Sequence, residues 1–165
     1  MGTYDVRAVA NEVLDEAFRS KRLVTHLSLQ KICFFAHGMY LAHSGSDLVR
    51  GEFEAWNYGP VHRVLYHALQ TFKDRPIVEH ISRIDPITGD RCGVPKIGER
   101  ADAKFVQNIA AFFLGFNASQ LVELSHAGGS PWSQVWKSAE EKPNIGMRIP
   151  NSIVGEFYRG VELKN

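Results

Sequence analysis

The sequence predicts a mainly α-helical fold, a compact helical domain with one small β-hairpin excursion. Three observations lead to this prediction. In most segments of the 165-residue chain, apolar residues recur at spacings of three and four, the period of an amphipathic helix. Ser, Asn, Pro and Gly stand where such helices would begin and end. The helical pattern lapses between Arg75 and Gly98, which leaves room for strands.

The N-terminal part of the chain predicts two helices. Residues 3–20 carry one apolar face and one charged face. Residues 29–44 follow Ser28, an expected N-cap, and end at Gly45, a common helix stop. Because this second segment is apolar nearly all round, we expect it to be the central helix, with Phe34 pointing away from its main apolar stripe.

The next segment combines an aromatic strand with a helix start. Residues 52–58 alternate in polarity and are expected to form one extended strand. Pro60 suits the first position of a third helix, where its missing N–H costs nothing. The buried stripe of this helix is expected to contain Val61, Val64, Leu65, Ala68, Leu69 and Phe72, and its other face Arg63, Tyr66 and His67.

The hairpin and the remaining helices follow from local signals. Residues 76–81 and 91–94 are predicted to pair across the turn residues 85–90. Residues 101–116 return to a helical pattern, and Asn117 with Gln120 has the spacing of a capping box. Further helices are expected to start at Ser130-Pro131 and at Pro150.

Composition and charge limit the class of protein. With 44% hydrophobic and 22% charged residues, the chain can form a core, and we expect a single domain over residues 1–165. Lys and Arg total 19 against 18 Asp and Glu, a balance that counts against direct nucleic-acid binding. The two cysteines suit a reducing compartment. No apolar run predicts a signal peptide or membrane span, so we expect a cytoplasmic protein.

Catalytic and cofactor motifs are weak. The sequence has no nucleophile elbow of the G-x-S-x-G type and no phosphate-binding glycine loop. Cys33 and His37 share a helix face, but a zinc site needs three or four such ligands. Glu52 and Glu54 fit one surface charge and one ion-paired carboxylate better than an acid–base pair. We therefore expect no enzyme, no metal and no cofactor.

Aromatic residues indicate a protein-binding surface instead. Large aromatic side chains outside the core stripe bury much area on binding for little entropy. The expected partner-binding residues are Phe34, Glu54, Trp56, Tyr58, Gly59, Pro60, Val61, Arg63, Tyr66 and His67. Trp56 could instead close the end of the helix bundle. A rival surface is the last helix, with Phe157 and Tyr158.

The carboxylate of Glu54 should need a partner, because it lies between aromatic residues and an unpaired buried charge is costly. Arg63, Lys31 or the first N–H groups of the third helix could supply it.

Three motifs in order give the chain a family resemblance. LQKICFFAHGMYLAHSG (29–45), FEAWNYGPVHRVLY (53–66) and LSHAGGSPWSQVW (124–136), with a final IPNSIVGEFY helix, resemble the Panacea domain of SocA-like, phage-associated proteins. The resemblance spans residues 28–160. Cys33, Met39 and the adjacent Ser125 and His126 depart from the family pattern at positions expected to be packed.

The resemblance implies a largely α-helical antitoxin of a bacterial or prophage toxin–antitoxin pair. Such a protein neutralises a toxin encoded beside it by direct contact. The SocA type is also an adaptor that delivers its toxin to a protease, a role that the residues here do not specify. Two alternatives remain: a small metal-dependent hydrolase that uses Cys33, His37 and Glu54, and a transcriptional regulator.

Overall fold

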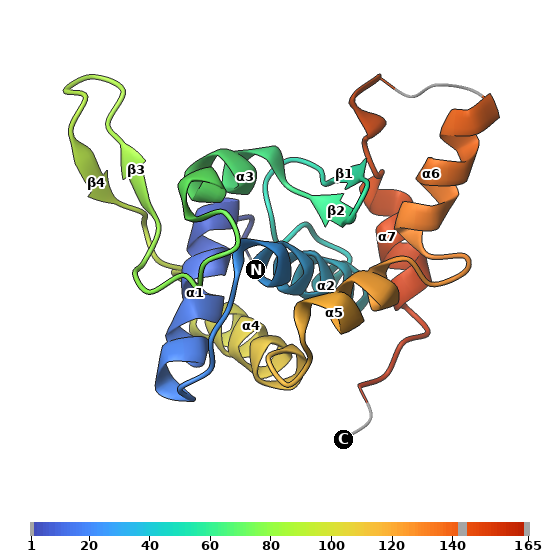
Figure 1. The fold of residues 1–165 in the computed structure, drawn as a ribbon. Helices are drawn as coiled ribbons and strands as arrows, with labels where there is room; N and C mark the ends of the chain where they lie inside the picture. Colours follow the sequence, from blue (N-terminus) through green and yellow to red (C-terminus); the bar gives the residue numbers. More distant parts are fainter. Residues whose placement is uncertain (1, 142–144, 164–165) are drawn as a thin grey trace.

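The computed structural model describes residues 2–141 and 145–163. Within them the chain is mainly α-helical with two small antiparallel hairpins, which confirms the predicted fold class (Figure 1). The helices are α1 (Val6–Arg19), α2 (His26–Ser44), α3 (Arg63–Leu69), α4 (Arg100–Phe113), α5 (Ala118–Ser125), α6 (Pro131–Glu141) and α7 (Asn151–Tyr158), with short 3₁₀ turns η1 (Gln70–Phe72) and η2 (Ile145–Met147). The strands are β1 (Glu54–Trp56), β2 (Gly59–Val61), β3 (Ser82–Ile84) and β4 (Arg91–Gly93).

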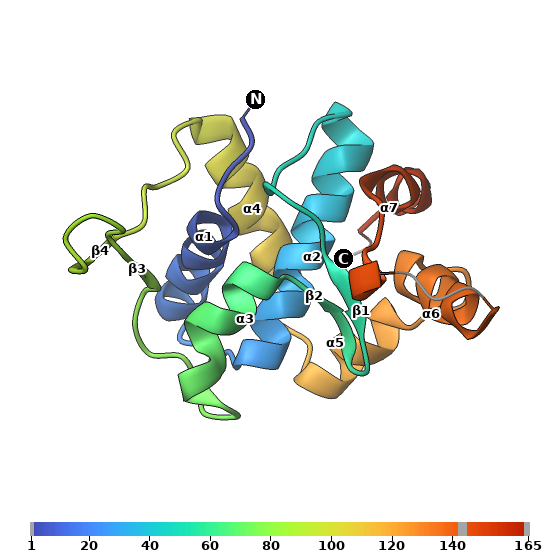
Figure 2. The same ribbon diagram turned by 90° about the horizontal axis from the view of Figure 1, so that it is seen from above.

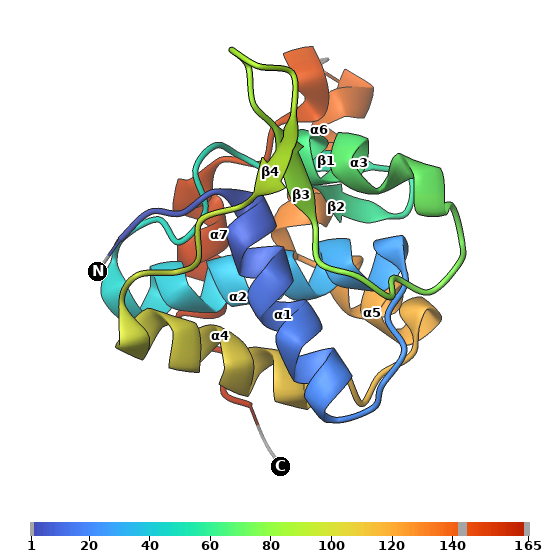
Figure 3. The ribbon, with the colours of Figure 1, turned by 90° about the vertical axis from the view of Figure 1, so that its left-hand side faces the viewer.

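Helix α2 is the centre of the fold, as its all-round apolar pattern predicts. Every residue from Ser28 to Tyr40 is buried. Helices α1 and α4 pack on one side of α2, and α7 on the other (Figure 2). In Figure 3, α1 crosses in front of α2, with α4 beneath both. This surrounded position explains why α2 needs no polar face.

Two expectations about α2 are wrong. The helix begins three residues earlier than predicted, because Thr25 rather than Ser28 is the N-cap and its side chain accepts a hydrogen bond from the Ser28 N–H. Phe34 does not point to the surface. It is 1% exposed and packs edge-on against Phe53, with ring centroids 5.2 Å apart. Gly45 ends the helix in the left-handed region, as predicted.

The segment predicted as one strand followed by a helix is a hairpin. Strands β1 and β2 pair so that Trp56 faces Gly59, with Asn57 and Tyr58 as the turn. Pro60 therefore lies in a strand, and α3 begins only at Arg63. Val64, predicted to be buried in α3, is 44% exposed.

The second hairpin extends from the body of the molecule, at the upper left of Figure 1. Strand β4 lies where predicted, but its partner is residues 82–84 rather than 76–81. The turn between them is the predicted one, and the Asp85 carboxylate accepts hydrogen bonds from the N–H groups of Ile87 and Thr88.

The C-terminal helices follow their predicted signals. Asn117 and Gln120 form the expected capping box of α5. Ser130 accepts a hydrogen bond from the Ser133 N–H at the start of α6. Pro150 is the N-cap of α7, so this helix begins at Asn151, one residue later than predicted. In the described residues no single helix could cross a membrane, and only α4 and α5 together, across a bend of 110°, reach the required length and hydropathy.

Candidate functional site

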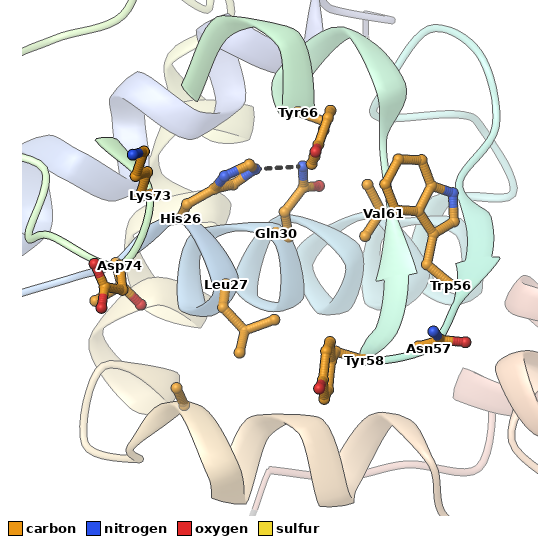
Figure 4. Close-up of a pocket in the computed structure, with 12 residues that line it drawn as sticks. His26, Leu27, Gln30, Trp56, Asn57, Tyr58, Val61, Tyr66, Lys73 and Asp74 are labelled. Atoms are coloured by element: carbon orange, nitrogen blue, oxygen red, sulfur yellow. Dashed lines mark hydrogen bonds between the residues drawn. The ribbon is translucent and has the colours of Figure 1, made fainter. Parts of the chain in front are cut away.

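A cavity of about 670 Å³ opens beside the β1–β2 hairpin. Four of the predicted partner-binding residues line it: Trp56, Tyr58, Val61 and Tyr66 (Figure 4). The other lining residues are Thr25, His26, Leu27, Gln30, Asn57, Lys73, Asp74 and Ala118. We call this space the hairpin cavity. Its volume lies in the range of sites that hold a ligand or an anchoring side chain.

Aromatic rings from three elements form the wall of the hairpin cavity. The ring centroids of Trp56 and Tyr66 are 4.9 Å apart, and those of Tyr66 and His26 are 5.4 Å apart. Tyr58 stands at the turn of the hairpin and is 69% exposed. A large aromatic side chain this open to solvent is a feature of protein-binding surfaces.

The predicted partner of Glu54 is confirmed as Arg63. The Glu54 carboxylate accepts hydrogen bonds from Arg63 Nε at 3.2 Å and Nη2 at 3.0 Å, and from the Trp56 indole Nε1 at 2.8 Å. Burial would raise the pKa of Glu54, but these hydrogen bonds and the Arg63 charge hold it below its ordinary value. Glu54 therefore fixes the indole of Trp56 and ties the hairpin to α3.

The hairpin backbone is also held from behind. Lys31 of α2 donates a hydrogen bond from Nζ to the Pro60 carbonyl at 2.9 Å. Gly59 has a φ of +100°, and a Cβ there would lie 2.5 Å from Ser125 Oγ, so this close approach requires glycine. The indole of Trp132 donates to the Trp56 carbonyl at 2.8 Å. The hairpin thus presents its side chains from a fixed backbone.

Sequence reasoning missed the contribution of α2 to the cavity. His26, Leu27 and Gln30 form part of its wall (Figure 4). Gln30 Nε2 approaches His26 Nε2 at 3.2 Å, and Gln30 also bonds the backbone of His62 through its Oε1 and Nε2 atoms. One signal could have indicated Gln30: a polar side chain inside a continuous apolar helix needs a polar partner.

The other predicted site residues lie in different surroundings. Arg63 is exposed, and its guanidinium lies over the Trp56 ring at 6.0 Å from the centroid. His67 is exposed on α3 beside Tyr66. Phe34 belongs to the core. On the rival surface, Tyr158 is 5% exposed and packs in the core, while Phe157 is half-buried.

The residues suggested for metal chemistry serve the fold. His37 accepts a hydrogen bond from the Val49 N–H at Nδ1, and its Nε2 lies 3.0 Å from Asn151 Oδ1. Cys33 is buried, which raises the pKa of its thiol. Among the described residues, no group of three or more His, Cys, Asp and Glu side chains could hold a metal ion. Glu52 is exposed and Glu54 is ion-paired, as the sequence predicts.

Comparison with known proteins gives two matches. The sequence profile of the family described as "Antitoxin SocA-like, Panacea domain" matches residues 29–133, which include α2 from Leu29 onward, the β1–β2 hairpin and α3. The chain is also 33% identical over 155 residues to the protein named "Antitoxin SocA" of Caulobacter vibrioides (strain NA1000 / CB15N), a match that covers 94% of this chain and 82% of that protein. No solved structure matches the chain.

Proposed function

Because the chain belongs to the SocA-like Panacea domain family of antitoxins, we propose that it neutralises a bacterial or prophage toxin by binding it directly. In this proposal it acts in the cytoplasm, as a binding protein rather than an enzyme, and the toxin is encoded by an adjacent gene. Family membership carries the proposal. The ion pair of Glu54 and the structural roles of Cys33 and His37 give no support to the hydrolase alternative.

The hairpin cavity and the β1–β2 turn are the proposed contact surface. A binding site that needs little ordering loses little entropy on association. Lys31, Trp132 and Arg63 hold the hairpin in place, and Tyr58 projects from it into solvent. A rigid backbone that carries an exposed aromatic side chain is the arrangement expected for an interface anchor.

Co-expression with the neighbouring reading frame tests the proposed function. The neighbouring gene alone should stop growth, and this chain should restore it and copurify with the gene product. Absence of rescue for every neighbouring gene would contradict the proposal. The amount of toxin during rescue separates two modes, because masking leaves its level unchanged and delivery to a protease lowers it.

A further inference from the structure

The edges of the β1–β2 hairpin are closed to a further strand. On β2, Pro60 has no N–H to donate, and its carbonyl already accepts the Lys31 bond. Beside β1, the Trp56 carbonyl accepts the Trp132 indole N–H, and Glu54 forms a bridge with Arg148. A partner that added a strand would need free backbone N–H and C=O groups at one of these edges. Recognition at this site must therefore use side chains, and the hairpin cavity is where a side chain fits.

Apolar side chains form most of the wall of the hairpin cavity. The side chains of Leu27, Trp56, Val61, Tyr66 and Ala118 line the hairpin cavity. Rings and branched aliphatic groups bury their area against walls of this kind. An aromatic or large aliphatic side chain of the partner is the expected occupant.

Helix α2 buries a cation, Lys31, against strand β2 of the same hairpin. Lys31 is 0% exposed, and its ammonium donates a hydrogen bond to the carbonyl of Pro60, the residue before the cavity-lining Val61. An ammonium group has three N–H donors, so this carbonyl satisfies only part of its capacity. Within the described part of the chain, none of the salt bridges includes Lys31. Burial lowers the pKa of Lys31 to about 7.

Burial and the charge of Lys31 lower the pKa of two nearby histidines. Burial and then the charge of Lys31 lower the pKa of His26, a cavity-lining residue, to about 4. The same two causes lower the pKa of His126, which follows Ser125 at the end of α5. Both imidazoles are thus neutral near pH 7, and neither offsets nor adds to the ammonium charge.

Charge balance at the cavity therefore favours an anionic partner group. Lys73 and Asp74 line the cavity and contribute one positive and one negative charge. The Glu54 carboxylate and the Arg63 guanidinium beside Trp56 are paired with each other. The ammonium of Lys31, which is protonated below its pKa of about 7, lies in surroundings of low dielectric, where a charge acts over a longer distance than in water. Resting on the proposed function, we infer that the hairpin cavity takes an apolar side chain of the toxin that has an Asp or Glu beside it in sequence, and that Lys31 selects for this acidic residue.

Three capped dipeptides test the inference without the toxin: N-acetyl-Glu-Phe-amide, N-acetyl-Gln-Phe-amide and N-acetyl-Lys-Phe-amide. Each is titrated into the full chain at pH 6.5 while the indole N–H signal of Trp56 is followed by NMR. The Glu peptide should bind at least about threefold more tightly than the Gln peptide, and the Lys peptide most weakly. Equal affinities, tighter binding of the Lys peptide, or no shift of Trp56 with any peptide at millimolar concentration would overturn the inference.

A variant and a pH series locate the preference at Lys31. Lys31→Met keeps the length of the buried side chain and should remove the preference for Glu over Gln, measured as the ratio of the two peptide affinities in the same protein, because loss of the Pro60 bond affects both peptides alike. Lys104→Met, an exposed position on α4, is the matched control and should keep the preference. In the wild type the preference should weaken from pH 6 to pH 8.5 as Lys31 loses its proton.

A preference that persists in Lys31→Met or at high pH would assign it to another group. N-acetyl-Gln-Phe with a free C-terminal carboxylate should bind no more tightly than the Glu peptide. Tighter binding would show that the site prefers a C-terminal carboxylate to an acidic side chain, and would overturn the inference. Growth rescue reports on the proposed function separately. Rescue without the peptide preference would reject the inference alone, and loss of rescue would reject the function.

Discussion

Replacing Glu54 with Gln removes a charge at the centre of the hairpin while keeping the shape of the side chain. The carboxylate accepts one hydrogen bond from the Trp56 indole and two from the Arg63 guanidinium. A hydrogen bond to a charged group contributes about 1.5–3 kcal/mol, and solvent screening reduces this where the partner is exposed. Glu54 is 8% exposed but Arg63 is exposed, so solvent weakens the two Arg63 bonds. We therefore attribute most of the expected change in stability to the indole bond. We expect a loss of about 2 kcal/mol in the free energy of unfolding, or about 4–8 °C in melting temperature.

Urea unfolding at several pH values measures this effect, with Glu52→Gln as the control because Glu52 is exposed two residues earlier. The pKa of Glu54 in the folded state lies below its ordinary value of 4.5. Its contribution is therefore present above that value and lost as the pH falls through the folded-state pKa. The stabilities of the wild type and Glu54→Gln should converge in acid. Equal stability at pH 7, an equal loss in Glu52→Gln, or a gap that does not change with pH would refute the argument.

Two further substitutions test how α2 is packed. In Gly38→Ala the new Cβ would lie 2.4 Å from the Tyr158 ring of α7. We therefore expect calorimetry to show a loss of about 1–3 kcal/mol in the free energy of unfolding. In the control Gly98→Ala the new Cβ meets nothing within 4 Å, so the free energy of unfolding should change little. The Lys31 pKa of about 7 lies below its ordinary 10.5, so the unfolded state binds more protons between these values and stability should rise with pH there. Chemical unfolding of Lys31→Met should lack this rise, and an identical pH profile in the two proteins would contradict a buried ammonium.

The helices could be predicted because their signals are local. The continuous apolar character of α2 identified the central helix, and the Asn117 and Gln120 pair identified the start of α5. The aromatic segment was harder, because Gly59-Pro60 is equally compatible with a helix start and with a strand. Contacts with residues distant in sequence distinguish the two, such as the hydrogen bond of Lys31 to the Pro60 carbonyl and that of Trp132 to the Trp56 carbonyl. Tertiary structure decides the conformation of this segment.

The candidate site was predictable to a similar extent. Aromatic composition identified Trp56, Tyr58 and Tyr66, which lie together around the hairpin cavity. Phe34 was misplaced because α2 is covered on all sides, so a residue away from its main stripe still meets a neighbour, in this case Phe53. The role of Lys31 could not be seen, since a lysine in an apolar helix can extend to the surface unless other elements cover it.

The affinity of Tyr58→Ala for the toxin tests the central claim most directly. Tyr58 is 69% exposed, so its truncation should leave the melting temperature unchanged. Ile87→Ala is the control, because Ile87 is 92% exposed at the tip of the other hairpin. Loss of an interface anchor costs about 2–4 kcal/mol, or about 30- to 1,000-fold in affinity. The account predicts this loss for Tyr58→Ala and none for Ile87→Ala. Unchanged affinity in a fully folded Tyr58→Ala protein would contradict the placement of the binding surface at the hairpin cavity.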